Sequence, residues 1–212
     1  MYFFKLYLKL NFIVPLFGNS YICGLILKTQ TIMEQKISPS KSALQFGILF
    51  GIFMVLEFVL LYVLNIDPIT NPTVGIIVNV LNYLVLPVAL IYIGCDNYKK
   101  KLNNGFISFG ESLKIGVTIC LIAGLIYALF SIAFNLMFPE FMDEILRKTR
   151  QVMLQQNPDM TSQQLEMAMS MTKKFMSPAL VVPVTVAMFS FIGLLYSLII
   201  GAIVKNEKPQ SF

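Results

Sequence analysis

The chain has 212 residues, of which 57% are hydrophobic and only 13% are charged. Soluble domains carry about a quarter charged residues because their surface faces water, so this composition excludes an ordinary soluble domain and indicates a lipid-facing protein. The formal net charge is +5. The lysines stand at the ends of apolar runs, which is typical of membrane orientation signals and speaks against nucleic acid as a partner.

The residue types that most often carry catalysis or bind metals are scarce. There is no His, and the three cysteines, Cys23, Cys95 and Cys120, are far apart and mostly in or near apolar segments. An odd set of widely spaced cysteines makes neither a disulfide framework nor a metal cluster. No nucleophile–base pair and no phosphate-binding loop is present, so we expect a protein that is not an enzyme, with no metal and no cofactor.

Residues 1–32 allow several interpretations. A basic start precedes an apolar run at 12–17, which is short for a signal peptide. A fifth span over 10–27 is long enough, although Pro15 weakens it. The alternative is that the protein begins at Met33 and that 1–32 lie upstream of the true start.

Four apolar stretches of membrane-spanning length follow in the chain. At about 1.5 Å per residue, helices of this length cross a hydrocarbon core of roughly 30 Å. We therefore predict an all-α fold, a four-helix transmembrane bundle, within one membrane domain at 33–208. The expected spans are 43–65, 74–95, 113–137 and 180–204.

Local signals indicate where these helices begin. Ser38 or Ser40 is available as an N-cap before the first span, and Ser108 with Glu111 has the spacing of a capping box before the third. The second span contains Pro87, which is tolerated where a neighbouring helix covers the carbonyl that the proline frees.

The distribution of basic residues predicts the orientation. Lysines flank the first span on its N-terminal side, fill the connection at 96–112 and follow the last span, whereas the connection at 66–73 has none. The longer connection at 138–179 has as many acids as bases. Since basic residues near span ends stay in the cytoplasm, we expect both termini and 96–112 to be cytoplasmic and 138–179 to be outside.

The outer connection, 138–179, has the pattern of two amphipathic helices. Pro139 suits a first helical turn, Asn157 and Pro158 end the first helix, and Thr161 opens the second with another capping box. We predict a helical hairpin that lies on the outer membrane surface or folds over the bundle. Its expected apolar faces are Met142, Ile145, Leu146, Val152 and Met153, then Leu165, Ala168, Met169, Thr172 and Phe175.

The sequence FISFGESLKIG at 106–116, combined with the four spans, the opening from Ser38 to Gly51 and the amphipathic outer connection, resembles the bacterial family called domain of unknown function 4199. The resemblance covers about 33–208 and favours the start at Met33. It implies a bacterial inner-membrane protein of four helices. It brings no known activity and no catalytic residue.

Glu57 is the one charged residue well inside the first span. An ionisable residue at membrane depth faces the bundle interior and is a functional candidate by default. Glu57 and Asn82 each lie eight residues from the outer end of an antiparallel span, about 12 Å deep, and Asn79 shares a helix face with Asn82. Either a protonated Glu57 hydrogen-bonds to Asn82 and joins two helices, or this group is a proton or cation site.

Small residues at four-residue steps predict where helices approach closely. The first span has Gly47 and Gly51. Such a row of small residues, here called a seam, either packs against another helix of the same chain or, where a seam is left uncovered, joins two copies in a homodimer. The remaining seams are Gly116, Cys120, Gly124 and Ala128 in the third span and Gly193, Ser197 and Gly201 in the fourth.

Two functions remain open from the sequence. The first is a non-enzymatic membrane protein that acts through helix or outer-loop contacts with a membrane-protein partner in the lipid bilayer. The alternative is a small oligomeric transporter or ion-coupled carrier that uses Glu57, in which case water must reach that residue.

Met167, Met169 and Met171 resemble thioether ligands for Cu(I), but on a helix Met169 points away from the other two.

Overall fold

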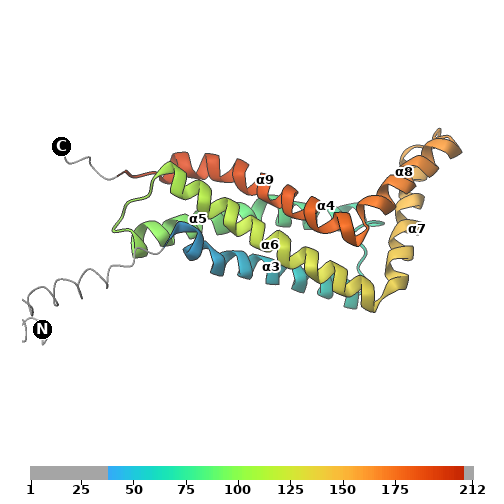
Figure 1. The fold of residues 1–212 in the computed structure, drawn as a ribbon. Coiled ribbons are helices and arrows are strands. Elements are labelled where there is room, and N and C mark those ends of the chain that lie inside the picture. The colour runs from blue at the N-terminus through green and yellow to red at the C-terminus, as the bar shows by residue number, and fades with distance from the viewer. Residues whose placement is uncertain (1–37, 208–212) are drawn as a thin grey trace, which may run out of the picture. The chain divides into compact units, whose positions relative to one another are not determined.

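The computed structural model describes residues 38–207, and it is helical along almost this whole length (Figure 1). Within this range, four helical segments are long and apolar enough to cross a membrane, at Pro39–Val63, Pro72–Leu102, Phe109–Met137 and Pro178–Val204. The predicted all-α fold with four transmembrane helices is confirmed. The expectations for 1–32 and for Met33 lie outside the described residues.

Polar caps and prolines set the starts of the helices. Helix α3 (Pro39–Val63) begins after Ser38, whose side chain accepts from the Lys41 amide. Helix α6 (Phe109–Met137) begins with the predicted capping box of Ser108 and Glu111, and α9 (Pro178–Val204) begins on a proline. The first turns of α3 and α6 are polar and need not lie in lipid, so these two helices start before the apolar runs. Helix α9 starts two residues before its predicted span because Pro178 suits a first helical turn.

Helix α6 is the centre of the bundle. It packs against α3 on one side and against α9 on the other, and α5 (Leu86–Asn97) contacts all three (Figure 1). Large side chains between these helices are fully buried, among them Phe50 and Ile91. This tightly packed core therefore occupies the half of the bundle that includes α5.

The second span is interrupted by a wide turn near its middle. It comprises α4 (Pro72–Val80), the π-helix η2 (Leu81–Val85), α5 and the π-helix η3 (Tyr98–Leu102). Pro87 has no N–H to donate to the Tyr83 carbonyl. The Tyr196 hydroxyl of α9 donates to that carbonyl at 2.9 Å, so a neighbouring helix covers the freed group as expected.

The ends of the second and fourth spans meet at one end of the bundle. The Lys99 ammonium donates to the Val204 carbonyl at 3.0 Å, which satisfies a terminal carbonyl of α9. Ile107 and Asn206 pair through two backbone hydrogen bonds. Lys99 was predicted only as an orientation signal, and its capping contact is additional.

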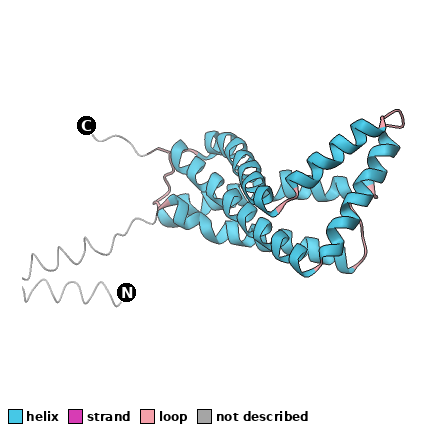
Figure 2. Cartoon of the chain, turned by 45° about the vertical axis from the view of Figure 1, so that its right-hand side comes forward, coloured by secondary structure: helices cyan, strands magenta, loops and turns pink. Residues whose placement is uncertain are grey.

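The connection between α6 and α9 forms two helices, α7 (Pro139–Gln156) and α8 (Ser162–Phe175), which lean away from the bundle (Figures 1 and 2). Arg150 of α7 and Glu166 of α8 form an ion pair at 3.3 Å. The capping box that begins at Thr161 is present. The membrane side on which these helices lie stays a prediction.

The side chains predicted as the apolar faces of α7 and α8 are mostly sheltered from solvent. Leu165 is 4% exposed, and most of the others are half-buried. Phe175 is the exception at 52% exposed. It lies at four-residue steps from Met167 and Met171, which are also exposed, so α8 carries an uncovered apolar stripe of three residues.

Candidate functional site

The structure brings Glu57 of α3 and Asn82 of η2 together. The Asn82 side-chain amide donates to a Glu57 carboxyl oxygen at 2.5 Å. Asn82 is only 8% exposed, and it sits on the π-helical turn that separates α4 from α5. Such turns are uncommon and often mark functional sites.

The carbonyl oxygen of the Asn82 side chain is buried and accepts no hydrogen bond from the described residues. A buried acceptor without a donor costs about 1–3 kcal/mol. The missing donor has to come from a protonated Glu57, from water or from a ligand.

A cavity of about 340 Å³ begins at this pair. It runs beside α3 from Glu57 and Asn82 to Asp67 and Lys148, and Asn79 also lines it. Ligand sites in proteins have volumes of roughly 300–1,000 Å³, so the cavity has room for a small molecule. Five aromatic side chains contribute to its wall, namely Phe58, Tyr62, Tyr83, Tyr127 and Phe141.

The cavity exists because α4 does not pack closely on the other spans. No residue of α4 is buried, whereas α5, further along the same span, buries Pro87, Ile91, Gly94 and Cys95. One half of the second span is therefore held in the core and the other half leaves space beside α3.

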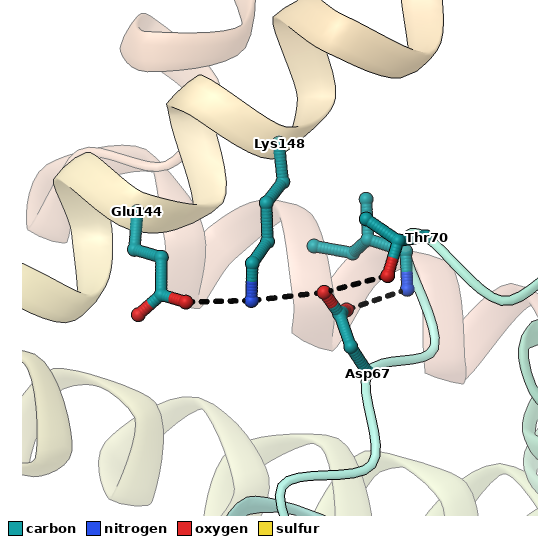
Figure 3. A network of polar contacts seen from close by, with 5 residues as sticks. Asp67, Thr70, Glu144 and Lys148 are labelled. Atoms are coloured by element: carbon teal, nitrogen blue, oxygen red, sulfur yellow. Dashed lines mark hydrogen bonds and ion pairs between the residues drawn. The ribbon is translucent and has the colours of Figure 1, made fainter.

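Asp67, Glu144 and Lys148 line the cavity and take part in a polar network (Figure 3). The Lys148 ammonium of α7 lies 2.9 Å from Asp67 and 2.6 Å from Glu144. The Asp67 carboxylate also accepts from the Ile69 amide at 2.9 Å and from the Thr70 hydroxyl at 3.0 Å. The network ties the connection between α3 and α4 to α7.

These contacts change the pKa values of both charged partners. Partial burial alone would raise the pKa of Asp67, but the hydrogen bonds from Lys148, Ile69 and Thr70 outweigh it, so the pKa is lowered. The pKa of Lys148 is raised, chiefly by its hydrogen bonds to Asp67 and Glu144. Both shifts favour the charged forms of the pair.

A cluster of aromatic rings fixes the start of α7 on the bundle. The Phe141 ring meets Phe58, Tyr62 and Phe134 edge-on, with centroids 5.7, 5.6 and 5.0 Å away. Edge-to-face pairs of this kind add about 0.5–1.5 kcal/mol each beyond the area they bury. Since Phe141 also lines the cavity, the position of α7 and the shape of the cavity are linked.

The predicted glycine seams all face other helices of the same chain. A Cβ atom on Gly47 or Gly51 would meet Ile122 or Ile126 of α6. On Gly116, Gly124, Gly193 and Gly201 it would meet residues across the contact between α6 and α9. A second copy would therefore have to pack on another surface. Gly94 lies outside the predicted seams and packs against Ile119 in the same way.

The methionines considered for copper do not converge. Met167 and Met171 are exposed on one face of α8, and Met169 is half-buried on another. Within residues 38–207, no three Cys, Asp or Glu side chains are grouped as metal ligands.

Several cavity residues were not found from the sequence. Glu144 and Lys148 have the (i, i+4) spacing of a helical ion pair, which could have been noticed. Asp67 gives no sequence signal for its contact with Lys148, because the two come from different connections. Nothing in the sequence distinguishes Phe141 and Tyr127 from the many other aromatic residues of the chain.

Four apolar spans, with a cavity that reaches a carboxyl group inside one of them, define a multi-pass integral membrane protein. The family described as "Protein of unknown function (DUF4199)" matches residues 45–206. The chain belongs to this family. No curated protein and no solved structure matches the chain.

Proposed function

We propose that the protein is a small ion-coupled carrier in which Glu57 binds and releases the coupled ion or the ligand. The observation that supports this is the cavity that runs from the network of Asp67 and Lys148 to Glu57 and Asn82. A carrier requires water to reach Glu57, whereas a carboxyl group that only joins two helices does not. The cavity therefore favours the carrier over a purely structural pair.

The carrier works as an oligomer in this proposal. The four spanning helices within residues 38–207 show no inverted repeat in their sequence, which leaves little room for alternating access within one chain. The glycine seams are occupied within the chain. The exposed side chains of Ile76 and Ile77 on α4 offer the second copy a surface next to the cavity.

The titration of Glu57 tests this function. Proton exchange requires the Glu57 carboxyl to gain and lose its proton between about pH 5 and 9. Infrared difference spectra of the protein in lipid should show a carboxyl band that changes over this range and is absent in Glu57→Gln. A Glu57 carboxyl that stays protonated from pH 5 to 9 would leave Glu57 as a structural partner of Asn82 and refute the carrier.

A second function, contact with a partner membrane protein, is favoured by the uncovered apolar stripe of α8. Met167, Met171 and Phe175 are each more than half exposed, and exposed apolar patches mark interaction sites. A photocrosslinking residue at Met171 should give one discrete adduct in cells, and the same residue at Ser170, beside the stripe, should give little. Equal crosslinking at both positions, or only adducts with lipid, would exclude a protein partner there.

We place the protein in a bacterial inner membrane with both termini in the cytoplasm, and we propose no enzymatic activity and no cofactor. The distribution of lysines supports this orientation. With the native cysteines removed, an impermeant thiol reagent on intact cells should label a cysteine at Ser162 and leave one at Asn104 or Glu207 unlabelled. The reverse pattern would overturn the orientation.

A further inference from the structure

The charges that line the cavity favour a cation. Its walls contain three carboxyl groups, from Glu57, Asp67 and Glu144, and one ammonium group, from Lys148. Lys148 is already paired with two of these acids at the far end. Glu57 forms no ion pair with a basic side chain of residues 38–207, and its carboxyl group accepts from the Asn82 amide. A cation beside Glu57 would supply the missing opposite charge.

The remaining wall suits an organic cation better than a bare metal ion. Aromatic rings attract ammonium groups through their π faces and also contact apolar groups. Tyr83 and Tyr127 line the cavity with Glu57. The volume of about 340 Å³ equals that of roughly eleven liquid water molecules at about 30 Å³ each, which is more than a single dehydrated ion needs.

Asn82 adds a requirement for a hydrogen-bond donor. Its side chain is more than nine-tenths buried, and its carbonyl oxygen has no donor among the described residues. A protonated amine has N–H groups that can serve the Glu57 carboxylate and this oxygen together. A quaternary ammonium has the same charge but no N–H, so it would leave the oxygen unsatisfied.

We propose that the cavity binds a primary or secondary ammonium cation with an apolar body, its N–H groups donating to Glu57 and Asn82 and its body lying against the aromatic wall. This inference rests on the proposed function, because it requires that the cavity is open to ligand. It adds the chemical class of the ligand and the contacts that select it.

Equilibrium dialysis of the purified protein in lipid nanodiscs tests the selection. The probes are 2-phenylethylammonium and n-hexylammonium, with the matching alcohols as neutral controls and the trimethylammonium forms as controls without N–H. Each ammonium should bind at least tenfold more tightly than its alcohol and several-fold more tightly than its trimethylated form. Empty nanodiscs correct for partitioning into lipid.

Two variants locate the site. Glu57→Gln removes the carboxylate and should abolish the preference for the ammonium over the alcohol. Glu166→Gln removes the same charge from the exposed surface of α8, where it pairs with Arg150, and should leave the preference unchanged. Failure of both ammonium probes to bind better than their alcohols overturns the inference, and so does a preference that survives in Glu57→Gln.

The two proposals fail in distinguishable ways. If the carboxyl band of Glu57 changes with pH but the ammonium probes show no preference, the carrier stands and its ligand is of another class. If Glu57 stays protonated over the whole range and no probe binds, both proposals are refuted. Equal binding of the ammonium and trimethylammonium forms would refute the role of Asn82 while keeping selection by charge.

Discussion

The contact between α6 and α9 makes the sharpest prediction about stability. Gly193 of α9 faces α6 so closely that a Cβ atom added to it would lie 2.8 Å from the Gly116 carbonyl oxygen and 2.8 Å from the Cys120 Cβ. One of these neighbours is backbone and cannot move without shifting the helix. Overpacking of this kind costs about 1–3 kcal/mol, and alanine recovers at most about 1 kcal/mol through its higher helix propensity. We expect Gly193→Ala to lower the free energy of unfolding by about 1–2 kcal/mol.

Gly110 provides the matched control, because a Cβ atom there would meet nothing within 4 Å. Gly110→Ala should be neutral or stabilise the protein by up to about 1 kcal/mol. Both variants can be compared by reversible unfolding in mixed micelles with increasing dodecyl sulfate, followed by far-UV circular dichroism. The close contact between α6 and α9 would be refuted if Gly193→Ala unfolded at the same detergent fraction as the wild type.

Two further predictions concern single polar contacts. Tyr196→Phe removes the hydroxyl that donates to the Tyr83 carbonyl and should lower the free energy of unfolding by about 0.6 kcal/mol. Pro87→Ala restores an N–H for that carbonyl, so in this background the effect of Tyr196→Phe should shrink toward zero in the same unfolding assay. An unchanged effect would contradict the contact. Because the pKa of Asp67 is lowered and that of Lys148 raised, their stabilising contact should be complete between about pH 5 and 9. It should be lost as pH falls below the usual Asp value of about 3.9 or rises above the usual Lys value of about 10.4. The distance between spin labels on the 66–71 connection and on α7 should increase at those extremes of pH, and in Lys148→Met it should be increased at every pH. A distance that is the same in Lys148→Met and in the wild type would contradict the role of the ion pair.

The parts of the fold that depend on local sequence could be predicted. Apolar length identifies the four spans, and capping spacing places the starts of α6 and α8, because both signals act within a few residues. The meeting of Glu57 and Asn82 followed from their equal depth in adjacent antiparallel spans. These inferences need no knowledge of how side chains pack.

The cavity could not be predicted, because it depends on long-range packing. Its open side results from the poor packing of α4, and no pattern in the sequence distinguishes that half of the second span from the half that is buried. The π-helical turn beside Pro87 is also decided in three dimensions, where Tyr196 of α9 satisfies the freed carbonyl. The ion pair of Asp67 and Lys148 joins connections that are far apart in the chain.

Two neighbouring positions of α4 test whether water reaches the cavity beside Glu57. Val78 lines the cavity, whereas Ile77 is exposed at 60% but is not part of the cavity wall. Cysteines at the two positions, in a background without the native cysteines, differ in access to water but hardly in depth. A polar thiol reagent should modify Val78→Cys at least tenfold faster than Ile77→Cys, since thiolates form in water and not in lipid. Equal rates, or no reaction at Val78→Cys, would contradict a water-filled path to Glu57.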